Sequence, residues 1–238
     1  MEVWILVNNQ AGRQHARENG EQVRRVFALG GARARVAYTD TVEEGAVFLQ
    51  QAVEAQPDLL VCCGGDGTLS QALNVLQQLD AKLPLGYVPM GTTNDFAASL
   101  GLPKEPAKAA EQILHGQPRL LDLGRFGERE FLYVASFGAF TQSSYKAAPQ
   151  VKAVLGHLAY VLESAKELPF LRACSLQVDT GDALYEGEYL FGAVSNTLSV
   201  GGILKLDPQA VHLDDGLLEL TLVRMPKNPV ELGQAAAM

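Results

Sequence analysis

The chain has 238 residues, of which 47% are apolar and 19% are charged, and this balance is typical of a folded protein with a substantial core. Its formal net charge of −8 at pH 7 argues against non-specific binding to nucleic acid. No apolar run approaches the roughly 20 residues that span a bilayer, so we expect no transmembrane segment. Three cysteines, two of them adjacent in an apolar run, give no disulfide framework and fit a reducing cytoplasm.

The charges are not spread evenly along the chain. Six arginines lie within residues 1–40, where only three glutamates and one aspartate oppose them. A basic face of this kind could favour an anionic lipid or a nucleotide. A solvated helix face explains the same residues, and we favour that interpretation.

The first 115 residues alternate between short apolar runs and amphipathic segments. Residues 3–7, 35–38, 59–63 and 85–89 are predicted as strands, and residues 15–29, 43–55, 69–79, 94–100 and 106–115 as helices. Strands that alternate with helices indicate a parallel sheet with helices on its faces. We therefore predict an α/β domain over residues 1–123.

After Asp122 the pattern changes to strands separated by glycine-rich turns. Residues 132–140, 175–179, 188–196 and 216–223 are predicted as strands, with one helix over residues 151–168. We predict a second, β-rich domain over residues 124–238, built as an antiparallel sheet or sandwich. Because a new helix begins at Val230 and stops at Met238, this domain is expected to be incomplete, and its exposed sheet edge would favour a homodimer.

A glycine-rich turn, here called the first loop (residues 64–68, GGDGT), follows the strand at residues 59–63. Glycines let the backbone approach a phosphate without an intervening Cβ, and the N-terminus of a helix attracts an anion. Asp66 adds a carboxylate for a divalent cation, and Thr68 is predicted to cap the helix. The alternative is a tight turn in which Asp66 merely caps the following helix.

A second loop (residues 91–95, GTTND) follows the strand at residues 85–89 and repeats this arrangement with hydroxyl groups added. Its alternative interpretation is a pair of N-cap residues, Asn94 and Asp95, at a helix start. Because carboxyl ends of neighbouring parallel strands meet at one edge of a sheet, the two loops together predict a polyphosphate site.

Two acidic segments lie further along the chain. Asp122 ends a short apolar run and would complete three carboxylates around a magnesium–phosphate group if it faced the same cleft, but an acid in this position is more often a surface or capping residue. Residues 205–217 form a polar turn before a strand. This turn is either an ordinary Asp-Gly hairpin turn or a hard-cation site made of a carboxylate and backbone carbonyls.

These motifs together resemble the bacterial diacylglycerol kinase-like lipid kinases, a family related in fold to NAD kinases and phosphofructokinases. The resemblance runs over nearly the whole chain, and the second loop distinguishes it from the NAD kinases. It rests on the two loops, Phe96, Leu100-Gly101-Leu102-Pro103, Asp122, Lys152 with Leu155-Gly156, Gly201-Gly202, Leu206-Asp207-Pro208 and Asp214-Asp215-Gly216.

The resemblance implies an ATP- and Mg²⁺-dependent kinase that phosphorylates diacylglycerol at the membrane surface, with the nucleotide and the lipid meeting between the two domains. Asp66, Asp95 and Asp122 would organise Mg²⁺ and its waters, and Asp215 with the main-chain carbonyls of His212 and Leu217 would hold a second, structural Mg²⁺. The residues implied to contact ATP are Asn8, Asn9, Gln10, Ala11, Gly12, Thr39 (or Thr41), Gly64, Gly65, Asp66, Gly67, Thr68, Leu69, Ser70, Gln71, Gly91, Thr92, Thr93 and Asn94.

The chain departs from the family pattern in two places. Asn8-Asn9 stands where the family usually has Asn-Pro, and the Asp-Gly-Glu segment that carries the family's catalytic base does not occur in the 238 residues. The base would then lie beyond Met238. Three alternatives stay open: a kinase for a sphingoid lipid, a kinase for NAD, which the second loop disfavours, and a noncatalytic nucleotide-binding module, which the missing tripeptide favours.

Overall fold

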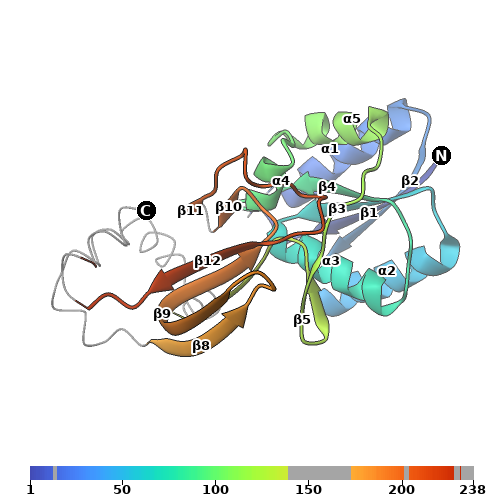
Figure 1. Ribbon diagram of the computed structural model, residues 1–238. Helices are drawn as coiled ribbons and strands as arrows, with labels where there is room; N and C mark the ends of the chain where they lie inside the picture. The colour runs from blue at the N-terminus through green and yellow to red at the C-terminus, as the bar shows by residue number, and fades with distance from the viewer. Residues whose placement is uncertain (13–14, 139–172, 201–203, 228–230, 232–238) are drawn as a thin grey trace.

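The computed structural model describes residues 1–12, 15–138, 173–200, 204–227 and 231 (Figure 1). The expected helices over residues 151–168 and from Val230 onward, and the Lys152 and Gly201 motifs of the resemblance, lie outside these residues. The expected α/β architecture in the first half and the antiparallel sheet in the second half are both confirmed. The boundary after residue 123 stays a prediction.

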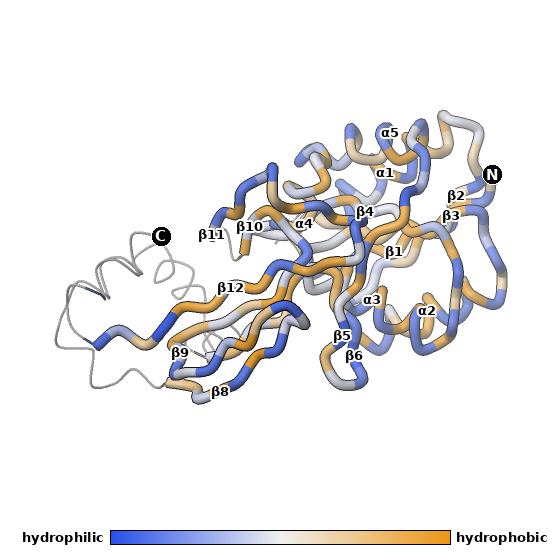
Figure 2. Tube along the Cα trace, in the orientation of Figure 1, coloured by the Kyte–Doolittle hydropathy of each residue, from blue (hydrophilic) through white to orange (hydrophobic). Residues whose placement is uncertain are grey.

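A four-stranded parallel sheet in the order β2-β1-β3-β4 forms the centre of the first half. Its central strands are apolar on both faces, as is typical of a sheet covered by helices on both sides, and Figure 2 shows the hydrophobic run along β1. The strands are β1 (Glu2–Asn8), β2 (Arg33–Thr39), β3 (Leu59–Gly64) and β4 (Leu85–Pro89).

Five helices, α1 to α5, accompany this sheet, and they cover both of its faces (Figure 1). Alternate residues of a strand point to opposite faces, so Val3, Ile5 and Val7 pack in the core with α1, whereas Trp4 and Leu6 pack in the core with α2 and α3. The helices are α1 (Ala16–Leu29), α2 (Val42–Ala55), α3 (Asp66–Gln78), α4 (Asp95–Ser99) and α5 (Pro106–His115).

Helix α3 begins three residues earlier than its predicted start at Leu69. Gly65 is its N-cap residue and contributes no side-chain cap, so Asp66 already belongs to the first turn. The expectation that Thr68 caps this helix is therefore wrong. Its hydroxyl instead accepts a hydrogen bond of 2.8 Å from Asn8 Nδ2, which ties the first loop to the end of β1.

The second half is built on an antiparallel sheet whose central strand is the 12-residue β9. Strand β9 pairs with β8 along its first half, with β7 along its second half and with β12 on its other edge. The strands are β7 (Val134–Gly138), β8 (Cys174–Asp179), β9 (Leu184–Ser195) and β12 (Glu219–Arg224).

Two short strand pairs in the described residues were not predicted. One pairs β5 (Gly124–Phe126) with β6 (Arg129–Phe131), and the other pairs β10 (Ser199–Val200) with β11 (Leu204–Lys205). The first pair is held against α3, because Asn74 Nδ2 donates 2.9 Å to Glu130 O and Asn74 Oδ1 accepts 3.2 Å from Glu130 N.

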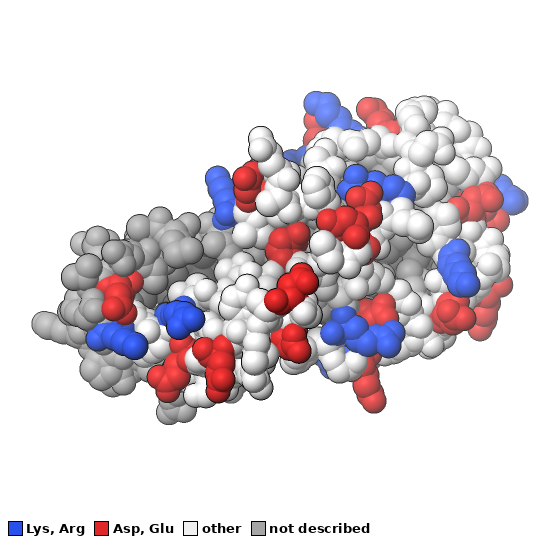
Figure 3. Space-filling model, viewed as in Figure 1, with Lys and Arg blue, Asp and Glu red and all other residues white. Residues whose placement is uncertain are grey.

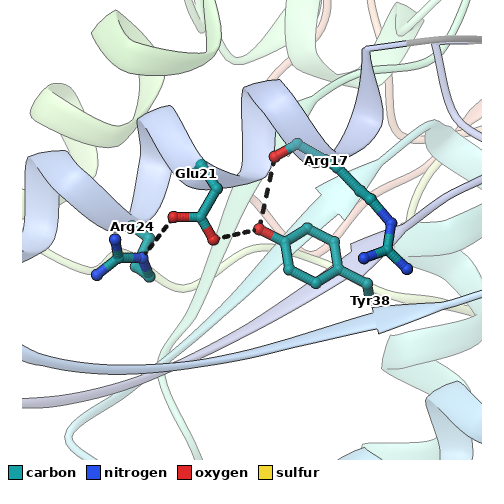
Figure 4. Close-up of polar contacts among 4 residues, drawn as sticks. All are labelled: Arg17, Glu21, Arg24 and Tyr38. Carbon is teal, nitrogen blue, oxygen red and sulfur yellow. Dashed lines mark hydrogen bonds and ion pairs between the residues drawn. The ribbon is translucent and has the colours of Figure 1, made fainter.

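The arginine-rich face of α1 and β2 is engaged by local partners. Tyr38 Oη donates 2.7 Å to Glu21 Oε1, Arg24 pairs with the other oxygen of Glu21, and the Arg17 guanidinium lies 5.1 Å from the centre of the Tyr38 ring (Figure 4). Burial and the neighbouring Glu21 raise the pKa of Tyr38 to about 12. These contacts agree with a solvated helix face, and Figure 3 shows acidic and basic groups interspersed over one side of the molecule.

Candidate active site

A cavity of about 560 Å³ lies at the carboxyl ends of β1, β3 and β4. Its size falls within the range of roughly 300–1,000 Å³ that is typical of ligand pockets. Every residue of its lining belongs to the set that the family resemblance implied for ATP. The lining consists of Asn8, Gln10, Ala11, Gly12, Gly65, Gly67, Thr68, Gln71, Gly91 and Thr92.

The first loop presents backbone to this cavity. Thr68 N and Leu69 N donate the first bonds of α3 to Gly65 O, so the N–H groups of Asp66 and Gly67 precede the helical ladder. A Cβ built on Gly67 has no atom within 4 Å. The open end of a 13-residue helix thus faces the cavity, and this arrangement attracts an anion.

The second loop packs directly on the first. A Cβ built on Gly91 would lie 2.6 Å from the Gly65 Cα, closer than two carbon atoms can approach without a backbone shift. Asn94 closes the loop on itself, because its Oδ1 accepts 2.9 Å from Gly91 N and its Nδ2 donates 2.8 Å to Gly91 O. Asn94 adopts a left-handed conformation (φ 53°), which asparagine tolerates better than most residues.

The loop after β1 completes the third side of the cavity. Asn8 Oδ1 accepts 2.8 Å from Gln10 N, and Ala11 N donates 3.0 Å to Asn8 O. Gly12 follows with φ of +72°, and a Cβ there would lie 3.2 Å from Met90 O. A residue with a side chain would therefore strain this loop both by its backbone angle and by contact.

Asp66 spans the two loops. Its Oδ2 accepts 3.0 Å from Asp95 N, and its Oδ1 accepts 3.3 Å from Phe96 N and 3.4 Å from Tyr87 Oη. The carboxylate therefore binds the first N–H groups of α4, the helix after the second loop, and α3, which Asp66 begins, has no side-chain cap. Burial raises the pKa of Asp66, with the backbone hydrogen bonds acting in the opposite direction.

The other two predicted acids make contacts with the second half of the chain. Asp95 is 5% exposed, and its carboxylate accepts 2.6 Å from Tyr133 Oη and 3.0 Å from Ser199 Oγ. Asp122 Oδ2 accepts 2.7 Å from Gly216 N, which belongs to the predicted structural cation turn. Tyr133 and Ser199 were not predicted as site residues, because each lies far from Asp95 along the chain.

The predicted structural cation turn is closed by its own acid. Asp215 Oδ1 accepts 3.0 Å from Leu217 N, and Gly216 has φ of +79°. Buried Asn196 reaches the same turn, since its Nδ2 donates 3.2 Å to Leu213 O and 2.9 Å to Asp122 O. Within the described part of the chain, no group of three or more His, Cys, Asp and Glu side chains could by itself hold a metal ion.

A second cavity of about 200 Å³ adjoins the first, and Asn8, Gln10, Thr68 and Gln71 line both. It contains Thr39 and Thr41, the two alternatives that the sequence left open. The rest of its lining consists of Leu6, Asp40, Val42, Gly45, Ala46, Leu49, Ala72 and Val75.

The remaining predicted residues lie around the cavities. Leu69 is 4% exposed and packs in the core beneath α3, while Gly64 is buried at the end of β3, where a Cβ would lie 2.5 Å from that of Thr68. Asn9 Nδ2 donates 3.1 Å to Asp40 Oδ1. Ser70 and Thr93 lie outside both linings, at the first turn of α3 and in the second loop.

No helix in the described residues is both long and apolar enough to cross a membrane. A family model of the diacylglycerol kinase catalytic domain matches residues 2–126. A diacylglycerol kinase from Bacillus subtilis (strain 168) is 34% identical over 221 residues, which are 92% of this chain and 73% of that protein. One from Staphylococcus epidermidis is 34% identical over 195 residues, which are 82% of this chain but 61% of that protein.

Solved structures agree with this match. A diacylglycerol kinase structure from Bacillus anthracis (strain Sterne) shares the fold with a TM-score of 0.75 at 23% identity, over 99% of this chain and 77% of that one. A further structure from the same organism gives a TM-score of 0.78 at 25% identity, over 99% of this chain and 79% of that one. Because the family model covers more than half of the chain, the chain belongs to the diacylglycerol kinase catalytic-domain family of lipid kinases.

Proposed function

We propose that this protein transfers the γ-phosphoryl group of ATP to the hydroxyl of diacylglycerol or a similar lipid, giving phosphatidic acid. The observation that supports this most is the 560 Å³ cavity, because all of its lining except Gln71 of α3 comes from the three loops at adjacent strand ends. Phosphoryl transfer depends mainly on positioning and on neutralising charge. A helix N-terminus and glycine backbone contribute to both.

The two adjoining cavities fit the two parts of a nucleotide. The larger one has backbone N–H groups and the hydroxyls of Thr68 and Thr92, which are suited to phosphate oxygens. The smaller one combines aliphatic side chains of α2 and α3 with polar groups that include Thr39 and Thr41, and this mixture suits a nucleoside. We infer that the polyphosphate lies against the first and second loops and the nucleoside between α2 and α3.

Mg²⁺ fits the donors that are present, because it commonly takes one or two carboxylates together with phosphate oxygens and waters. Asp66 would hold it most directly, with Asp95 and Asp122 ordering its waters, and a carboxylate that accepts three hydrogen bonds still has a lone pair for this. When bound, the ion neutralises charge on the phosphates. Asp215 with the carbonyls of His212 and Leu217 would hold the second, structural ion.

The acceptor would be reached at the membrane surface, with the protein acting peripherally from the cytoplasm. Dimerisation through a sheet edge stays a prediction, because the structure contains a single chain.

A radiolabel assay tests the proposal. The chain, together with any residues that its natural reading frame adds after Met238, is given γ-labelled ATP, Mg²⁺ and diacylglycerol in mixed micelles. We expect label in phosphatidic acid, and we expect Asp66→Asn to reduce the rate by about 10²-fold or more because it removes the acid that links both loops. Asp182→Asn, in the exposed turn between β8 and β9, is the matched control and should leave the rate unchanged.

Other outcomes distinguish the alternatives. Label in a sphingoid base or in NAD, with none in phosphatidic acid, would replace the acceptor. ATP binding by calorimetry without transfer to any acceptor would favour the noncatalytic module. A normal rate for Asp66→Asn at matched folding would remove Asp66 from the mechanism.

A further inference from the structure

A set of partly buried polar contacts, here called the polar seam, joins α4 to the second half of the chain. At its first residue, the Asp95 carboxylate accepts one hydroxyl on each oxygen, from Tyr133 and from Ser199. One turn later, Ser99 Oγ lies 2.7 Å from Thr197 Oγ1 and accepts 2.9 Å from Leu198 N. The polar seam thus connects α4, in the nucleotide-binding half, to residues 197–199 and to Tyr133, the residue before β7.

The N-terminal N–H groups of α4 are held by the first loop. Asp66 accepts the backbone N–H groups of Asp95 and Phe96, and it lies between Gly65 and Gly67, which line the cavity. Helix α4 has only five residues, too few to be stable on its own. Its position is therefore set by the groups that bind it: Asp66 at its first N–H groups, and the hydroxyls of Tyr133 and Ser199 at the Asp95 side chain.

We propose that Tyr133 and Ser199 are positioning residues for phosphoryl transfer: by fixing the Asp95 carboxylate, their hydroxyls set the placement of the acceptor-binding half relative to the nucleotide loops. This inference rests on the proposed function. Neither side chain lines either cavity, so neither is expected to contact the nucleotide. Transfer between two bound substrates is sensitive to displacements of about 1 Å, which can cost about 10²-fold in rate.

Loss of either hydroxyl is expected to have a large effect, because the Asp95 carboxylate that accepts both hydrogen bonds is buried. Removing one leaves a buried carboxylate oxygen without its donor, and the side chain then turns or draws in water. Either response displaces the first turn of α4, where Asp66 is also bound. The predicted consequence is a loss of alignment with the nucleotide still in place.

The kinetic test compares kcat, the two KM values and the ATP dissociation constant. Tyr133→Phe and Ser199→Ala should lower kcat by about 10- to 100-fold with the ATP dissociation constant unchanged. Ser199→Thr retains the hydroxyl and should restore most of the rate. Tyr185→Phe, an exposed tyrosine of β9, is the matched control and should behave as wild type. Wild-type kcat in both hydroxyl variants, or a loss of ATP binding that parallels a loss of stability, would overturn the inference.

A second readout does not depend on activity. ATP with Mg²⁺ should slow amide exchange in the first loop and also in residues 197–200 of the wild-type chain. Tyr133→Phe should abolish the slowing of exchange in residues 197–200 and leave the slowing in the first loop. If the wild-type chain transfers nothing to diacylglycerol, the proposed function fails, while this exchange measurement still decides the coupling. Equal protection of residues 197–200 in wild type and Tyr133→Phe would refute the coupling.

Discussion

The two glycine loops look alike in sequence but are stabilised in different ways. The first loop has no side-chain cap on its own helix, and Gly67 faces open space. The second loop is closed by two hydrogen bonds from Asn94 and starts a helix of only five residues. Asp66 of the first loop accepts the N–H groups at the start of that second helix.

This difference shows that the loops form one unit, in which the first supplies an open helix end and the second supplies its support. Gly65 and Gly91 face each other closely: a Cβ on Gly91 would lie 2.6 Å from Gly65 Cα, and a Cβ on Gly65 would lie 3.3 Å from Gly91 Cα. The two loops therefore have similar sequences but different structural roles. Substitutions that act on one loop alone can test this difference in roles.

The largest effect is expected from Gly91→Ala compared with Gly67→Ala. The added methyl at position 91 meets Gly65 backbone at 2.6 Å, so it should cost about 3 kcal/mol of unfolding free energy and abolish nucleotide binding. The methyl at position 67 meets no atom within 4 Å, so stability should hold while ATP affinity falls, because that space belongs to the cavity. Urea unfolding and calorimetry measure both. Equal stability losses would contradict the packing of loop on loop.

A smaller effect is expected at Asn94. Asn94→Ala loses both bonds to Gly91 and places alanine at φ of +53°, so we expect a loss of about 2 kcal/mol and weaker ATP binding. Asn94→Gly relieves the backbone and should lose about half as much.

The control for this pair is Gln56→Ala, at the end of α2, where the residue is also left-handed (φ 50°). Glutamine has no special tolerance for left-handed backbone, so this change should cost little beyond the exposed hydrogen bond from Gln56 Nε2 to Val53 O and should leave ATP affinity unchanged. If Asn94→Ala were no worse than Gln56→Ala in both measurements, the closing bonds would have no special role.

The smallest effect is the pH dependence that comes from Asp66. Burial raises its pKa in the folded state, so the folded chain holds this proton more tightly than the unfolded chain does. The stabilisation is present below an unfolded pKa of about 4 and is lost as pH rises through the folded pKa. Wild type should therefore lose stability relative to Asp66→Asn as pH rises from about 4. Urea midpoints at a series of pH values check this, and parallel curves for the two proteins would show that Asp66 does not titrate differently on folding.

The sequence predicted the parallel half well because its signals are local. The apolar runs at β1, β3 and β4 and the glycine loops after two of them are readable from neighbours along the chain, whereas the other residues of the cavity lining were implied only by the family resemblance. The start of α3 was misplaced because Asp66 and Thr68 both suit a cap position, and only the loop packing decides between them.

What the sequence could not reveal depends on residues brought together from afar. Tyr133 and Ser199 lie 38 and 104 positions from Asp95, and nothing near them indicates that they share a carboxylate. The strand pairs β5–β6 and β10–β11 are two or three residues long, too short for a periodic pattern. Asp122 was singled out as a carboxylate at the end of an apolar run, whereas in the structure its hydrogen-bond donor is Gly216 N.

The most direct test of the account is amide hydrogen exchange of the wild-type chain with and without ATP and Mg²⁺. We predict slower exchange in the first loop, in the second loop and in residues 8–12, with β8 and β12 showing no such local change. Protection confined to the second half of the chain, with these three loops unaffected, would contradict the assignment of the cavity to the nucleotide.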